Sequence, residues 1–132
     1  IQIPANVFDK RFLNKKLLKK LKEKNISIFV RSVFLKGILI NKKFRDKNKF
    51  FDKYKKEFNF YERWLEKKNI INKIFFCINY ILANKIKNIV IGFDNFDEYK
   101  EIANFQREKY VYPPNFVKPQ NDRNKLLRPD LW

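Results

Sequence analysis

Three short apolar runs, separated by stretches of helical periodicity, constrain the fold of this chain more than any other feature. The runs are rich in Ile, Val and Phe and cover residues 1–8, 26–34 and 88–93. The last run, NIVIGF, is almost continuously apolar, which is typical of a strand buried on both faces of a parallel sheet. Strands that alternate with helices form right-handed βαβ units. We therefore expect an α/β fold whose strands run parallel.

Between and after these runs, apolar residues recur every three or four positions, which predicts amphipathic helices. The helices expected on this ground cover residues 10–24, 49–68 and 71–82. A further helix, predicted from its capping signal, is expected to end near Arg107. Asp9 is expected to cap the first helix. Asn95 and Glu98 form a capping box at the start of the last one. The polar residues 41–48 are interpreted as a loop.

Three parallel strands do not complete a domain, because both outer edges of such a sheet stay unpaired. The sequence therefore predicts part of a larger α/β domain. Residues 1–107 contain all the expected strands and helices, whereas residues 108–132 contain every Pro after Pro4 and are expected to form an irregular arm. Because the chain has no Met, we expect its natural reading frame to start before Ile1.

The residue types that are missing exclude several classes of site. The chain has no His and a single Cys, Cys77, which excludes a His general base, a tetrahedral zinc site and a disulfide framework. Cys77 is expected to be a small core residue, since no base is present to activate it. No apolar run approaches the roughly 18–20 residues of a membrane span, and no targeting segment is visible. We expect a cytoplasmic protein without a membrane segment.

The formal net charge of +17 suggests a nucleic-acid partner, but the type and spacing of the basic residues do not support one. Lys outnumbers Arg by 24 to 7, whereas base recognition favours Arg. The enriched residues Lys, Asn, Ile and Phe all have AT-rich codons. The densest basic runs, 15–24 and 42–56, are interrupted by Leu or Phe at helical spacing. We expect solvated helix faces, nonspecific adhesion to polyanions and no specific nucleic-acid binding.

Four segments resemble, in order, the C-terminal half of the aldo/keto reductase family, and they span essentially the whole chain. They read QIPANVFDKRF, VRSVFLKGILI, NIVIGFDNFDEYKEI and LLRPDLW. The first three are similar to the sixth, seventh and eighth barrel strands of that family with the segments that follow them. The fourth is similar to the closing residues of one bacterial branch. The resemblance implies the C-terminal portion of a (β/α)8 TIM barrel, with strands six to eight and their helices.

Members of that family are oxidoreductases that reduce carbonyls with NADP(H) or NAD(H), through an Asp, Tyr, Lys and His tetrad on the early strands. None of that tetrad falls in this chain, so the resemblance implies no catalytic residue here and an inactive fragment. It does imply binding of the nicotinamide cofactor. The implied partners are a small carbonyl or sugar-like substrate and the missing N-terminal half of the barrel. Residues 36–48 and the arm would shape the substrate mouth.

The resemblance places five cofactor-binding positions in the first two segments. Gln2 stands where the family binds the nicotinamide carboxamide, although an outward polar residue at a strand start is an equally simple explanation. Arg31 stands where many members have an aromatic residue that stacks on the nicotinamide; a guanidinium can also stack. Ser32, Phe34 and Gly37 match the loop around the pyrophosphate, or they form an ordinary strand exit with a glycine turn.

Four further positions lie in the third segment. Gly92, Asp94, Asn95 and Glu98 stand beside the adenosine end of the cofactor, where a helix N-terminus favours anions. Helix capping alone would also explain Asn95 and Glu98. The family often has a basic residue hereabouts for a 2′-phosphate. This sequence has Tyr99 and Lys100 instead, and Asp94, Asp97 and Glu98 add negative charge. NADP(H) and NAD(H) therefore both stay open.

Two other functions are compatible with the sequence. One is a non-enzymatic half-barrel that pairs with itself or with another chain, because the sheet edges need a partner. The other, less favoured by the charge distribution, is a basic nucleic-acid-binding protein.

Overall fold

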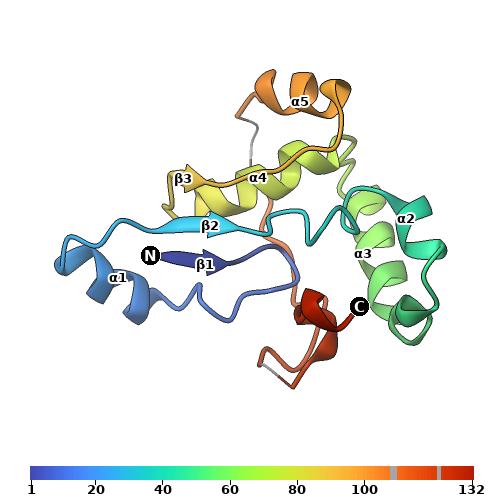
Figure 1. Cartoon of the computed structure of the whole chain (residues 1–132), viewed down its shortest axis with the longest axis horizontal. Coiled ribbons are helices and arrows are strands. Elements are labelled where there is room, and N and C mark those ends of the chain that lie inside the picture. The colour runs from blue at the N-terminus through green and yellow to red at the C-terminus, as the bar shows by residue number, and fades with distance from the viewer. Residues whose placement is uncertain (108–109, 122) are drawn as a thin grey trace.

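The fold is built around a small parallel sheet, as the alternating pattern predicts. The computed structural model describes residues 1–107, 110–121 and 123–132. Its strands are β1 (Gln2–Pro4), β2 (Phe29–Arg31) and β3 (Asn88–Ile89), paired in the order β1-β2-β3 (Figure 1). Both strand pairs are parallel, and their register aligns Gln2, Phe29 and Asn88. The predicted strand direction is confirmed; closure into a (β/α)8 barrel stays a prediction.

The helices follow the predicted order. They are α1 (Lys15–Glu23), α2 (Lys42–Asp46), α3 (Lys55–Lys67), α4 (Lys73–Ala83) and α5 (Phe96–Ala103). Short 3-10 helices form η1 (Lys49–Tyr54), η2 (Lys125–Leu127) and η3 (Pro129–Leu131). The lysines of α1 are exposed, and this helix has no buried residue. The basic run at 15–24 is therefore a solvated helix face, as expected.

Two local predictions about helix starts are wrong. Asp9 does not cap α1, because its carboxylate accepts hydrogen bonds from the guanidinium of Arg11; Asn14 caps α1 instead, accepting from the N–H groups of Lys16 and Leu17. Residues 41–48 are not entirely loop, because the side chain of Asn41 accepts from Phe44 N–H and starts α2. In both places an Asn side chain satisfies the first free N–H groups of a helix.

The expected burial of residues 88–93 on both faces is also wrong. Val90 is 44% exposed and Phe93 is 52% exposed. The sheet alternates: Ile3 and Val30 are buried in the core, whereas their strand neighbours Gln2 and Phe29 face solvent. One face of the sheet therefore packs on the core while the other is bare, as happens when a sheet is covered on one side only.

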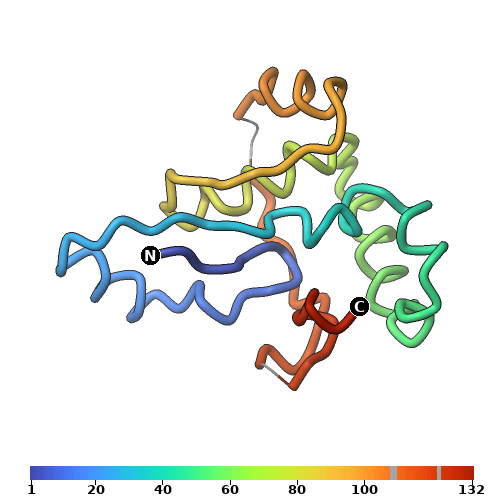
Figure 2. The backbone as a smooth tube through the Cα atoms, in the orientation of Figure 1, coloured from blue at the N-terminus to red at the C-terminus, as the bar shows by residue number. Residues whose placement is uncertain are grey.

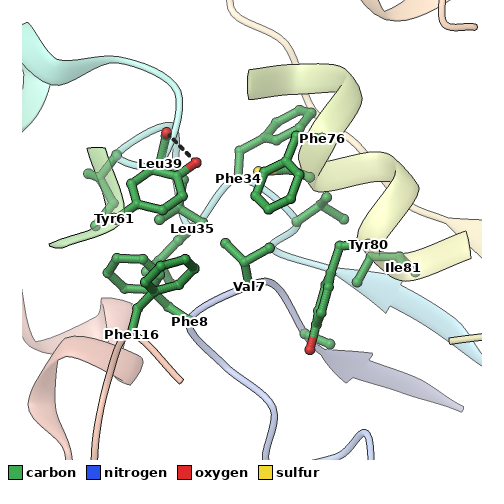
Figure 3. Packing of buried hydrophobic residues seen from close by; sticks show 14 of the residues in the cluster. Val7, Phe8, Phe34, Leu35, Leu39, Tyr61, Phe76, Tyr80, Ile81 and Phe116 are labelled. Carbon is green, nitrogen blue, oxygen red and sulfur yellow. Dashed lines mark hydrogen bonds between the residues drawn. The ribbon is translucent and has the colours of Figure 1, made fainter. Parts of the chain in front are cut away.

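An aromatic cluster joins the first loop to α3 and to the C-terminal arm (Figure 3). The ring of Phe8 lies 5.5 Å from Phe58, 5.3 Å from Tyr61 and 5.5 Å from Phe116, measured between centroids. Tyr61 and Phe116 also meet edge to face at 5.2 Å. Such aromatic pairs stabilise a core beyond their buried area. These contacts bring segments about 100 positions apart into one core.

The described part of the arm, residues 110–121 and 123–132, packs on the same core. Phe116, Val117, Leu126 and Leu127 are all buried in it. Gln120 links the arm to the loop after β1, donating to the carbonyl of Phe8 at 2.6 Å. The described part of the arm is irregular apart from η2 and η3, and its apolar side chains are part of the core.

A buried ion network connects α2, α3 and α4. The carboxylate of Glu62 lies 2.5 Å from Arg45 Nη2 and 2.7 Å from Lys73 Nζ, and the Arg45 side chain is 4% exposed. Arg45 also donates to the carbonyl of Ile38 at 2.5 Å. Burial by itself would raise the pKa of Glu62, but the hydrogen bonds from Lys73 and Arg45 outweigh it and hold that pKa below its usual value.

We expect Glu62→Gln to lower the free energy of unfolding by about 2 kcal/mol at neutral pH, because the buried guanidinium of Arg45 loses its anionic partner. The folded-state pKa of Glu62 is below its unfolded-state value. Its contribution is therefore complete above the unfolded value and is lost as the pH falls through the folded one. Urea denaturation of both proteins at neutral pH and near pH 3 should show the difference shrinking in acid.

The matched control is Asp52→Asn. Asp52 and Lys55 form an ion pair at 2.9 Å whose side chains are 58% and 71% exposed. Removing an exposed pair should change stability by less than about 0.5 kcal/mol. Equal losses in the two variants would contradict the structural importance of the buried network.

Candidate functional site

The candidate site is a cavity of about 370 Å³ beside the ends of β2 and β3. Both strands continue from the sheet at the same end (Figure 2), as parallel strands must. Six of the nine predicted residues line the cavity: Ser32, Phe34, Gly37, Gly92, Asp94 and Glu98. In open parallel α/β sheets, ligands bind at the carboxyl ends of the strands. The structure thus brings most of the predicted positions together at one place.

The loop after β2, residues 32–37, has an unusual backbone. Four of its residues have positive φ: Ser32 at 61°, Leu35 at 48°, Lys36 at 52° and Gly37 at 82°. Only Gly adopts this region without a steric penalty. The side chain of Leu35 is 1% exposed within the core, so its burial offsets that penalty and fixes the shape of the loop.

The carbonyl groups of this region are bonded to the rest of the protein. Ser32 O accepts from Asn6 Nδ2 at 3.0 Å and Leu39 O accepts from the Tyr61 hydroxyl at 3.2 Å (Figure 3). By contrast, the N–H groups of Lys36 and Gly37 make no hydrogen bond within the part of the chain that the structure describes. Backbone N–H groups left free in a turn are a common way to bind anions.

The second wall of the cavity comes from the connection between β3 and α5. Asn95 Oδ1 accepts from Glu98 N–H at 2.9 Å, so the predicted cap is confirmed. The carboxylate of Glu98 accepts from Asp94 N–H at 2.9 Å. In a standard capping box the Glu98 carboxylate would accept from the N–H of Asn95, the cap residue itself. Here it accepts from the N–H of Asp94, so the expected pairing is wrong by one residue. Glu98 still satisfies a free N–H at the helix start.

Three predicted residues lie outside the cavity lining. Gln2 is exposed on β1, where it is aligned with Phe29 on the bare face of the sheet. Arg31 is exposed at the end of β2, and its guanidinium donates to Ser32 Oγ at 3.3 Å. Asn95 is occupied as the cap of α5.

Other lining residues were not singled out from the sequence as cofactor-binding positions. They are Val33, Lys36, Ile40, Asn41, Phe44, Ile74, Val90, Ile91 and Ile102. Helical periodicity identifies Ile74 and Ile102 as apolar positions on α4 and α5, but periodicity does not indicate that they face a cavity. Lys36 was detectable as the neighbour of Gly37. The lining combines apolar side chains with a few charged groups, as ligand sites do.

The site has few groups suited to catalysis. Among the described residues, no three His, Cys, Asp or Glu side chains lie close enough to hold a metal ion. Cys77 is buried, and burial raises the pKa of its thiol to about 12, so it stays protonated near neutral pH. This agrees with its expected place in the core. The lining offers a ligand the Ser32 hydroxyl, two carboxylates, the Lys36 side chain and apolar surface.

Comparisons with protein-family models, with curated proteins and with solved structures find no match for this chain. In the described ranges, none of the helices has the length and apolar character needed to cross a membrane.

The two glycines of the cavity provide a test of the loop conformation. A Cβ at Gly37 or at Gly92 would meet no atom within 4 Å, but only Gly37 has a positive φ, of 82°. Gly37→Ala should therefore lower the free energy of unfolding by about 1 kcal/mol through backbone strain alone. Gly92→Ala should be neutral, or stabilising by about 0.5 kcal/mol, because it restricts the unfolded chain. Urea denaturation measures both values, and a reversed order would contradict the left-handed geometry at Gly37.

Proposed function

We propose that this chain is the cofactor-binding C-terminal part of an NAD(P)H-dependent aldo/keto reductase. The observation that carries the proposal is the convergence of Ser32, Phe34, Gly37, Gly92, Asp94 and Glu98 on one cavity. These residues were selected from two separate segments of the sequence. Their common position at the carboxyl ends of neighbouring parallel strands is where barrel enzymes bind ligands.

Different residues of the cavity would bind different chemical groups of the cofactor. The free N–H groups of Lys36 and Gly37, with the Ser32 hydroxyl, suit phosphate oxygens. The carboxylates of Asp94 and Glu98 suit the hydroxyl groups of a ribose, which donate hydrogen bonds to acidic residues in dinucleotide sites. Phe34, Phe44 and Ile91 offer apolar surface for a ring. In this proposal the chain binds and orients the cofactor.

The reaction itself would be carried out by residues outside this chain. A nicotinamide cofactor transfers hydride to the carbonyl of a small aldehyde, ketone or sugar-like substrate. Proton donation would come from the missing N-terminal half of the barrel. The 132-residue chain alone should show no carbonyl reduction above a blank without protein, and measurable turnover by it would contradict this assignment.

The acidic lining predicts a cofactor preference. The carboxylates of Asp94 and Glu98 would repel a 2′-phosphate, so NADH should bind more tightly than NADPH by roughly fivefold. Glu98→Gln should remove most of this difference, because Gln keeps an acceptor for Asp94 N–H but carries no charge. Fluorescence titration of both cofactors measures the ratio.

Asp97→Asn is the matched control. Asp97 lies in the same first turn of α5 but does not line the cavity, so its neutralisation should leave the ratio nearly unchanged. Equal changes of the NADH to NADPH affinity ratio in Glu98→Gln and Asp97→Asn would indicate that the ratio depends on the overall charge near α5 and not on the cavity lining. Lack of binding of either cofactor by the wild-type chain would refute the proposed function.

The bare face of the sheet supports a second candidate function, a half-barrel that pairs with itself. Phe29, which is aligned with Gln2 on this face, is 40% exposed. Exposed apolar sheet faces and edges commonly bind a partner. The net charge of +17 opposes association of two copies, so pairing should strengthen as salt screens the repulsion.

Sedimentation velocity tests this candidate. A dimer that strengthens with salt and is weakened about tenfold by Phe29→Ser would support it, because a central apolar contact is lost. Ile71→Ser is the control, since Ile71 is 95% exposed on the α3–α4 connection, outside the sheet. A monomer at all salt concentrations that unfolds cooperatively would exclude self-pairing.

A further inference from the structure

In the arrangement that the structure shows, the charged side chains of the cavity do not favour binding of an anion. Asp94 and Glu98 contribute two carboxylates to the lining, whereas Lys36 is the only cationic residue among the described residues that line it. A phosphate would need that ammonium group, because the free N–H groups of the loop carry only partial charges. The position of the Lys36 side chain therefore decides whether the cavity can accept a phosphate.

In this structure the ammonium of Lys36 contacts the end of the chain. Its Nζ donates to the carbonyl of Pro129 at 2.9 Å and lies 5.6 Å from the centre of the Trp132 ring. The pKa of Asp130 is lowered chiefly by its hydrogen bond with Arg128 and, to a smaller extent, by the charge of Lys36. The last turn, η3 with Trp132, thus presents a carbonyl and a ring to one lysine.

The contact between Lys36 and η3 lies at the protein surface, and one polar atom of this region has no hydrogen-bond partner among the described residues. Lys36 is exposed and Leu131 is 48% exposed. Trp132 packs on Phe51 at 4.8 Å between ring centroids. The Nε1 of Trp132 is nevertheless buried with no hydrogen-bond partner in the described residues. A buried donor without an acceptor destabilises the docked position, which offsets part of the stabilisation from the ring contacts of Trp132.

The backbone of Lys36 is fixed while its side chain is not. Its φ of 52° belongs to the loop that Leu35 anchors in the core. A lysine side chain has four flexible methylene groups and can place its ammonium over a wide arc. Lys36 can therefore turn from Pro129 to the cavity without movement of the loop.

We propose that η3 and the phosphate of a bound dinucleotide compete for Lys36, so that ligand binding releases residues 129–132. This inference rests on the proposed function, because it requires a phosphate-bearing ligand in the cavity. The docked turn then lowers the apparent affinity of the free chain, since only molecules with Lys36 released are competent to bind.

A double-mutant cycle with NADH tests the competition. Lys36→Met should weaken binding about tenfold, whereas Lys16→Met, which removes the same charge from exposed α1, should have little effect. Trp132→Ala should tighten binding about threefold by weakening the docked turn, and should have no effect when combined with Lys36→Met. Leu131→Ala is the control in the same turn, because the contacts that the Lys36 ammonium makes with this turn are to Pro129 and Trp132. Unfolding curves of each variant exclude loss of fold.

Amide hydrogen exchange provides a measurement that needs no change in the arm. The Leu131 N–H donates to Arg128 O at 2.9 Å, so its exchange reports opening of the η3 turn, which we expect when the turn is released. Exchange there should become faster in Lys36→Met and in the wild-type chain saturated with NADH. Unchanged exchange under saturation, or equal affinities for Lys36→Met and Lys16→Met, would overturn the inference and leave the proposed function standing. No binding by the wild-type chain would overturn both.

Discussion

Anchoring of the loop after β2 against α2 and α3 is the interaction on which the candidate site depends. The side chains of Leu35, Ile38 and Leu39 are fully buried. Arg45 donates to the carbonyl of Ile38, and the Tyr61 hydroxyl donates to that of Leu39. Burial raises the pKa of Tyr61 well above its usual value, so the hydroxyl remains a donor throughout the neutral range. The contacts that stabilise the core therefore also fix the wall of the cavity.

Local chemistry explains why the helices and strand order were predictable. Helical periodicity located the segments that form α1, α3 and α4, and a capping box located the start of α5. Asn side chains cap helices throughout the chain, at Asn14, Asn41, Asn48, Asn72, Asn95 and Asn124. The cap at Asn95 was recognised because Glu98 follows at the spacing of a capping box. Asn14 and Asn41 were missed because a lone Asn also fits a loop.

Contacts between distant segments explain what the sequence could not predict. Lys36 meets Pro129 across 93 positions, and no local pattern indicates that contact. The apolar run at 88–93 was expected to be buried, but burial depends on what covers the sheet, and one face is bare here. Gln2 and Arg31 were placed correctly on strands, yet neither lines the cavity, because they lie on that exposed face.

The net charge of the chain and the charges that line the cavity have opposite effects on anion binding. The surplus of lysines creates a field that attracts any polyanion and weakens as salt rises. Among the described residues, the charged side chains that line the cavity are Asp94, Glu98 and Lys36, and the ammonium of Lys36 donates to the carbonyl of Pro129 in η3. An anion drawn to the surface thus gains no stable position until Lys36 is released. Long-range attraction increases the rate at which anions meet the protein. Whether an anion stays bound depends on whether the Lys36 side chain contacts η3 or the anion.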